Sequence, residues 1–234
     1  MLRRVLPVIA MLLFLGACSG SVPPPPAPSA PRGPSAAQQF VLYQQMLEAG
    51  NAELAVPLGE GILATFPDSP EAATVREAID GLRAKATAET ESRRLARLWS
   101  YQVAPMGGGQ QSTASIHARD AEPAGRERVR LVLRRHTEWG QSVFLYGNEP
   151  GFTCAKACRL TMRFDEEPAT SLLASIPPTG EPAIFIEEDK AFIAKLAKAR
   201  RVAIDVSEKG RDKRSLVFEV GGYAPDRFLP TPKK

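Results

Sequence analysis

The amino-acid sequence predicts an α+β protein. It places a helical hairpin first and then a mostly antiparallel β-sandwich or partly open barrel with one late helix. Two observations predict this order. Before Leu98 the apolar residues recur at spacings of three and four, as in amphipathic helices, and after it they alternate with polar residues, as in strands. One late stretch, from about Glu188 to Ala199, returns to the helical spacing. The chain is therefore divided into a helical segment, a β-rich domain and a polar tail, at 36–98, 99–224 and 225–234.

Residues 1–17 have the form of an export signal. Met1 to Arg4 is basic, and the apolar run from Val5 to Leu15 is too short to cross a bilayer core. The run ends in Leu15-Gly16-Ala17-Cys18, which resembles the lipobox of bacterial lipoproteins. The resemblance implies cleavage before Cys18, a diacylglycerol thioether on its sulfur and acylation of its new amino group. An ordinary secreted protein with an incidental cysteine is the alternative.

Residues 18–35 are predicted to be a lipidated cysteine followed by a tether. The stretch SGSVPPPPAPSAPRGPS is too rich in proline, serine and glycine to bury a core. Its prolines favour polyproline II, which rises about 3.1 Å per residue and acts as a spacer. In Gram-negative lipoproteins, a serine after the lipidated cysteine favours the outer membrane. We therefore expect an outer-membrane anchor, by which the lipid holds the protein on the membrane, and a folded part in the periplasm.

The segment 36–98 is predicted to hold three helices. Pro57, Gly59 and Gly61 weaken the second or break its first turn, whereas Ser69 and Pro70 suit the N-cap and first position of the third. The apolar residues at helical spacing are Phe40, Tyr43, Met46 and Leu47 in the first, Leu54, Leu58, Ile62 and Phe66 in the second, and Val75, Ile79 and Leu82 in the third.

The stretch AGNAELAVPLGEGILATFPDSPEA resembles the tetratricopeptide segments of envelope lipoproteins, in which a helix ends in an aromatic-proline turn. A free-standing solenoid needs about three such repeats, and the match covers one. The sequence therefore predicts that these helices pack on the β-rich domain or on a partner. A plain helical hairpin without a peptide groove is the favoured alternative.

Alternation in the segment 99–224 predicts about seven strands. In the clearest one, Val129, Leu131 and Leu133 form an apolar face and Arg128, Arg130 and Arg134 a basic face. The others are expected at 99–101, 115–117, 143–146, 160–164, 202–206 and 216–220. The loop between Val103 and Gln111 carries three consecutive glycines and is expected to be a flexible turn.

Several of these stretches together resemble a domain of uncharacterised bacterial envelope proteins, and they are distantly similar to accessory proteins of type VI secretion. The stretches are Trp99-Ser100-Tyr101, Val129 to Arg134, Phe152-Thr153-Cys154 with Cys158, Met162 to Asp165, Ala183 to Ile186 and Phe218 to Gly221. The shared motifs are mainly structural. The resemblance therefore implies a fold rather than an activity.

Cys154 and Cys158 remain once Cys18 carries lipid, and an oxidising periplasm favours their pairing. A five-residue extended segment would hold their Cα atoms about 13 Å apart, well beyond disulfide distance, so the chain must turn between them. If residues 152–153 and 159–160 are neighbouring strands, a three-residue hairpin loop sets the cysteines opposite each other. Redox catalysis and metal binding are the less favoured alternatives.

A basic strand face is the predicted binding surface. It consists of Arg126, Arg128, Arg130, Arg134 and Arg135. Such a face suits lipid phosphates or an acidic protein, although half-exposed strands also carry arginines for solubility. Nucleic acid is not expected as a partner, because the net charge of +4 is small and includes two arginines of the signal.

No catalytic, metal-binding or cofactor-binding motif is recognised in the sequence. Asp165, Glu166 and Glu167 could pair carboxylates as glycosidases do, but a solvated turn is the simpler interpretation. His117 and His136 have no ligand spacing and are expected to be surface or edge residues.

We therefore expect a non-catalytic envelope lipoprotein that interacts with an envelope protein or assists assembly. A secretion-accessory or peptidoglycan-contacting factor is the first alternative and an envelope hydrolase the second.

Replacing Cys18 with serine should release the protein from the membrane fraction, because the acyl chains have no other site of attachment in the predicted scheme. Fractionation of cells followed by immunoblotting measures this. Membrane retention equal to that of the wild type would contradict the lipoprotein interpretation.

Overall fold

The computed structural model of the protein describes residues 33–119, 129–155 and 157–228. The predicted signal, Cys18 and all but the end of the tether lie outside these residues, as do Arg126 and Arg128. The described part is a mixed α+β structure with four α-helices and one nine-stranded sheet. The helices are α1 (Ala36–Glu48), α2 (Ala52–Thr65), α3 (Pro70–Arg97) and α4 (Asp189–Leu196).

The strands are β1 (Trp99–Met106), β2 (Gly109–His117), β3 (Arg130–His136), β4 (Gly140–Tyr146), β5 (Cys158–Phe164), β6 (Thr170–Ser175), β7 (Ala183–Ile186), β8 (Val202–Val206) and β9 (Arg214–Phe218). Two 3₁₀ turns follow, η1 (Val220–Gly222) and η2 (Pro225–Arg227). No helix of the described residues is long and apolar enough to span a bilayer.

The first three helices pack on one another around a small core of their own. Its buried residues are Tyr43, Ala55, Ile62, Ala72, Val75 and Ile79. Each helix begins at a side-chain cap, supplied by Ser35, Asn51 and Ser69. The three helices thus share a core of their own, and α3 also packs on the β-rich domain at η1 and β1. Packing on a partner stays a prediction.

The interior of α2 also differs from the prediction. The helix continues through Pro57 and both glycines. Gly59 is buried, and a Cβ there would come within 3.0–3.1 Å of Val75, Ile79 and Tyr43. Close packing of the three helices thus stabilises a helix whose intrinsic propensity is poor. Leu54, predicted on the buried face, is 54% exposed.

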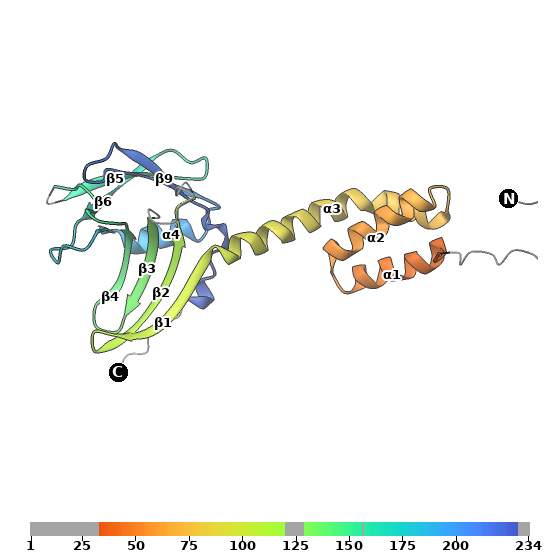
Figure 1. The fold of residues 1–234 in the computed structure, drawn as a ribbon, viewed down its shortest axis with the longest axis horizontal. Helices are drawn as coiled ribbons and strands as arrows, with labels where there is room; N and C mark the ends of the chain where they lie inside the picture. The colour runs from red at the N-terminus through yellow and green to blue at the C-terminus, as the bar shows by residue number, and fades with distance from the viewer. Residues whose placement is uncertain (1–32, 120–128, 156, 229–234) are drawn as a thin grey trace, which may run out of the picture.

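The sheet is antiparallel throughout, in the order β1-β2-β3-β4-β7-β6-β5-β8-β9. Among the described residues its two end strands, β1 and β9, do not pair with each other, so the sheet is not closed into a barrel. Figure 1 shows the sheet bending, so that β1 to β4 curve below β5, β6 and β9, with α4 in the bend. Both parts of the sheet and α4, through Phe192 and Leu196, contribute to one core.

Two of the nine strands, β6 and β7, are additional to the seven expected. Both are short, and β6 carries Leu172 and Leu173 in succession, so neither shows a clear alternation. The predicted flexible loop at 103–111 is instead the β1–β2 hairpin. Its turn is Gly107-Gly108, both with positive φ, as a two-residue hairpin turn requires. Val220, predicted at a strand end, lies in η1.

The segment predicted as a polar tail begins inside the folded domain. Residues 225–227 form η2, and Phe228 is completely buried in the core of the β-rich domain. The Phe228 carbonyl accepts a hydrogen bond of 2.6 Å from Arg135 Nη1, and the guanidinium lies 4.2 Å from the Phe228 ring centre. Residues 229–234 lie outside the described part.

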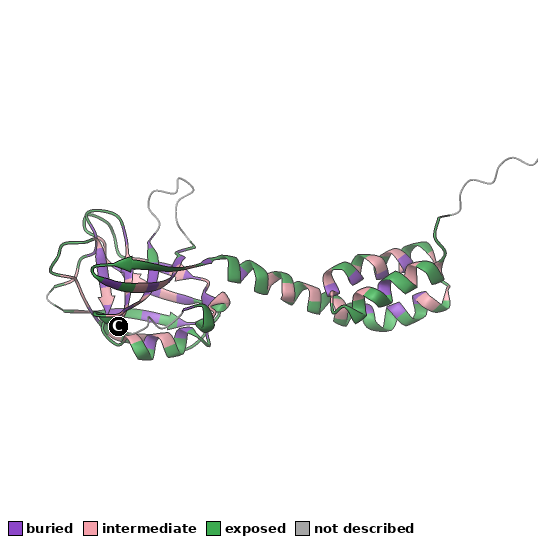
Figure 2. Cartoon of the chain, turned by 90° about the horizontal axis from the view of Figure 1, so that it is seen from below, coloured by how far each residue is buried: buried purple, intermediate pink, exposed green. Residues whose placement is uncertain are grey.

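The two units are joined by α3, which runs without interruption from the helical core to β1 (Figure 1). Between Ile79 and Leu95 it has no buried residue, and Figure 2 shows this stretch mostly exposed. Its last turn packs on η1. A Cβ on Gly222 would lie only 2.2 Å from the Leu95 carbonyl carbon, so the two backbones touch. Trp99 Nε1 donates to the Val220 carbonyl at 3.3 Å.

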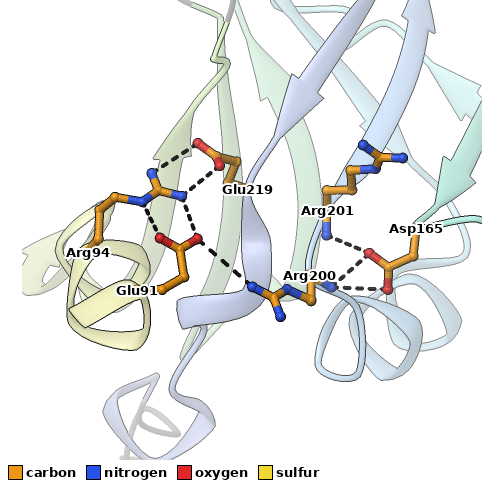
Figure 3. Close-up of polar contacts among 6 residues, drawn as sticks. All are labelled: Glu91, Arg94, Asp165, Arg200, Arg201 and Glu219. Atoms are coloured by element: carbon orange, nitrogen blue, oxygen red, sulfur yellow. Dashed lines mark hydrogen bonds and ion pairs between the residues drawn. The ribbon is translucent and has the colours of Figure 1, made fainter. Parts of the chain in front are cut away.

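Charged side chains reinforce this junction (Figure 3). The Arg94 guanidinium contacts Glu91, three residues earlier on α3, at 2.7 and 2.8 Å, and Glu219, just before η1, at 2.7 and 3.2 Å. These hydrogen bonds from Arg94 hold the pKa of the Glu219 carboxyl below its usual range. The ion pair is therefore present at neutral pH and is lost only on acidification.

Replacing Gly222 with alanine should lower the free energy of unfolding by about 1–3 kcal/mol, because the new methyl group overlaps backbone atoms that cannot move independently. Chemical denaturation followed by circular dichroism measures the change. The matched control is Gly81→Ala, at an open position inside α3, which should gain up to about 1 kcal/mol from helix propensity. Equal effects of the two substitutions would contradict the described junction.

Candidate functional site

The candidate site lies on the face of β3 that points away from the core. Leu131 and Leu133 are completely buried in the core, and Arg130, Val132 and Arg134 occupy the opposite face. The predicted basic face is thus present in part, with Arg130 and Arg134 on it. Arg135 was wrongly included, because strand alternation directs it to the other side, where it contacts Phe228.

Strand register extends this face into three rows across the sheet. The middle row is the apolar one, because Val132 lies beside Phe144, and Phe144 beside Phe185. The flanking rows each contain one arginine. From β2 outward the rows are His117, Arg130, Tyr146 and Ala183; Ser115, Val132, Phe144 and Phe185; and Thr113, Arg134 and Ser142.

These rows form the floor of a cleft of about 630 Å³. Ser100 and Gln102 of β1 extend the floor on one side, and on the other the β6–β7 connection contributes Pro177, Thr179 and Glu181. A volume of this size suits a small ligand or a short peptide segment. The cleft combines hydroxyl and amide groups, aromatic rings and two guanidinium groups.

Arg134 is held in place by aromatic rings. Its guanidinium carbon lies 5.2 Å from the ring centre of Phe144, 5.7 Å from Phe185 and 5.5 Å from Trp139. Its Nε donates a 2.9 Å hydrogen bond to Ser142 Oγ. Arg130, at the other end of the cleft, lies 5.4 Å from the ring centre of Tyr146. Rings orient both cations while leaving hydrogen-bond donors for a ligand.

The electrostatics of the cleft favour an anion. Partial burial lowers the pKa of Arg134, and the nearby Glu181 carboxylate opposes that effect. The pKa of Glu181 is itself lowered, first by a hydrogen bond from the Thr179 hydroxyl and to a smaller extent by Arg134. Within the described residues, neither Arg130 nor Arg134 forms an ion pair with a carboxylate. A partly desolvated cation without an ion-pair partner attracts an anionic ligand.

His136 lies at one end of this sheet face and has a structural role. It is 3% exposed, so the expectation of a surface or edge residue is wrong. Its ring stacks on Trp139 at 3.8 Å, Nδ1 accepts from the N–H groups of Glu138 and Trp139, and Nε2 lies 2.8 Å from the Met106 carbonyl. Because Nδ1 accepts, Nε2 carries the proton and donates. His136 thus holds the β1–β2 and β3–β4 hairpins together.

The acidic run Asp165-Glu166-Glu167 is placed in a turn. Asp165 accepts hydrogen bonds of 3.0 Å from the Arg200 N–H and 2.9 Å from the Arg201 N–H (Figure 3), and Glu166 forms an ion pair with the Arg201 side chain. Asp165 and Glu166 thus hold residues 200 and 201, which lead into β8. No cluster of three metal-ligating side chains is found among the described residues.

A disulfide joins Cys154 and Cys158, with a Cα–Cα distance of 5.4 Å. The expected hairpin around it is wrong. Phe152 bridges Glu208 and the Thr153 N–H donates to the Ser207 carbonyl, so this segment runs beside the end of β8 and does not pair with β5. The bridge therefore fastens the chain that enters β5 to the first residue of that strand.

The aromatic rings of the cleft are the functional residues that sequence reasoning missed. The available signal was in 143–146, where Val143 and Leu145 face one way and Phe144 and Tyr146 the other. A strand that is apolar on both faces either has other parts of the protein packed on each face or has one face that lines a cleft. Phe185 and Trp139 gave no such signal.

No family model matches the sequence, and no curated protein matches it in sequence. Among solved structures, invasion associated protein B from Bartonella henselae is similar in structure, with a TM-score of 0.38 and 18% sequence identity. The similarity covers 55% of this chain and 87% of that chain. A likeness this distant assigns no activity.

Replacing both Cys154 and Cys158 with serine should lower the free energy of unfolding by about 2 kcal/mol, the chain-entropy value for so short a loop. Denaturant unfolding measures the change, and mass spectrometry of non-reduced peptides should show the two cysteines joined in the wild type. Two free thiols in protein isolated from the periplasm would contradict the bridge.

Proposed function

We propose that this protein is a non-catalytic outer-membrane lipoprotein of the cell envelope, and that its β-rich domain binds an envelope partner in the cleft. One observation carries the proposal. Arg130 and Arg134 lie in a hollow on the sheet face opposite the core, oriented by aromatic rings and without an ion-pair partner among the described residues. Such a surface suits recognition of an anionic ligand.

The sequence features at the N-terminus support the proposed location. The lipobox-like Leu15 to Cys18 places an acyl anchor at one end, and the proline-rich tether separates it from the folded units. The disulfide is consistent with an oxidising compartment such as the periplasm. In this arrangement the cleft is presented to proteins of the envelope, and the three-helix unit lies between it and the membrane anchor along the chain.

Peptidoglycan is the second candidate partner. Ser100, Gln102, Thr113 and Ser115 offer hydroxyl and amide groups beside the rings of Phe144 and Phe185. Side chains of these kinds hydrogen-bond sugar hydroxyls and cover the apolar faces of sugar rings. A secretion-accessory role rests on the sequence resemblance alone.

Site-specific photocrosslinking in intact cells tests the proposal. A photoreactive amino acid at Ser115, on the cleft floor, should give adducts with one envelope protein, and the adducts should disappear in the Arg130→Gln/Arg134→Gln double variant. The matched control is the same amino acid at Arg163, an exposed position on β5. Adducts with peptidoglycan would favour the second candidate. Absence of adducts at Ser115, or the same adducts at both positions, would contradict the cleft as the binding site.

A further inference from the structure

The two arginines of the cleft are spaced along a line. They lie four residues apart on β3 and on the same face, so a rise of about 3.3 Å per residue sets their Cα atoms about 13 Å apart. Midway between them is Val132, beside the stacked rings of Phe144 and Phe185, whose centres are 4.9 Å apart. The cleft therefore presents a cation, an apolar patch and a second cation in succession.

Each cation is arranged to receive a carboxylate. The Nε of Arg134 is engaged by Ser142, and no hydrogen bond from its two terminal nitrogens is found within the described part of the chain. The three rings around it restrict its rotamers, so little side-chain entropy is lost on binding. Arg130 is exposed and rests over Tyr146. Planar guanidinium groups bind carboxylates through two parallel hydrogen bonds.

We propose that the cleft binds an acidic segment of polypeptide in extended conformation, with carboxylate side chains at positions i and i+4 and an apolar side chain at i+2. The inference rests on the proposed function and names its ligand. An extended peptide has the same rise as β3, so side chains at i, i+2 and i+4 lie on one face and meet Arg130, Val132 and Arg134 in turn. Thr113 and Ser115 of β2, beside β3, and Gln102 of β1, the next strand, supply hydrogen-bonding groups for its backbone.

Glu181 limits the affinity of this site. Among the described residues it is the one carboxylate that lines the cleft, and it lies close enough to Arg134 for each group to shift the pKa of the other. An incoming carboxylate at Arg134 is repelled by it. Removing this charge should therefore strengthen binding, an effect opposite in sign to removal of either arginine.

The test uses the full-length protein in detergent and a fluorescein-labelled peptide, Glu-Ser-Leu-Ser-Glu, with fluorescence anisotropy as the measurement. Arg130→Gln and Arg134→Gln should each weaken binding by about tenfold, the effect of losing one charged hydrogen-bonded contact. Glu181→Gln should tighten it several-fold. The matched control Arg163→Gln removes the same charge from an exposed position on β5 and should leave the affinity unchanged. Thermal melting of each variant identifies any loss of folding. Because Arg130 is exposed, Arg130→Gln is the substitution expected to disturb folding least.

Two further peptides test the spacing. The first has its glutamates two residues apart, loses one cation contact and should bind about tenfold more weakly. The second has glutamine in place of both glutamates, loses both contacts and should bind about a hundredfold more weakly. Equal affinity for all three peptides, or equal weakening by Arg163→Gln, would overturn the inference. Binding of isolated peptidoglycan through Arg134, with no binding of the peptides, would also overturn it while leaving the proposed binding function in place. If the peptides do not bind and no crosslinks form at Ser115, both the peptide inference and the proposed binding function are overturned.

Discussion

The contact between the end of α3 and the glycine turn η1 fixes how the two units of this protein are arranged. Gly222 lies so close to Leu95 that no side chain fits between the backbones, and Trp99 donates a hydrogen bond to the same turn. Since the preceding stretch of α3 is mostly exposed, packing at this turn, with the Arg94–Glu219 ion pair beside it, sets the direction of the helix. The three-helix unit therefore lies at the far end of one uninterrupted helix.

The same sheet that forms the core also forms the cleft, because the outer face of β4 carries aromatic rings beside the arginines of β3. On β3, Leu131 and Leu133 are buried against α4 and the second half of the sheet, while Val132 lies on the cleft floor. On β4, the rings of Phe144 and Tyr146 face the arginines. Apolar groups on the outer face keep Arg134 partly out of water, which strengthens its attraction for an anion.

Local signals in the sequence were sufficient for much of the fold. Capping residues and apolar spacing located the helices, and alternation located the longer strands, because these features depend on neighbours within a few residues. The signals failed where packing overrides them. The poor helix formers in α2 are stabilised by the close approach at Gly59, and β6 and β7 are strands only because they are paired between β4 and β5.

By itself, the sequence determined the α+β order, the cysteines available for pairing and the alternation that makes one face of β3 basic. It also carries the prediction of a lipid anchor at Cys18, which lies outside the described residues. Only the tertiary structure decided that Arg135 meets Phe228 in the core, and that Phe185, far along the chain, lies in one row with Val132. The physical reason is that strand alternation sets the faces of a strand, whereas the pairing of distant strands sets what those faces meet.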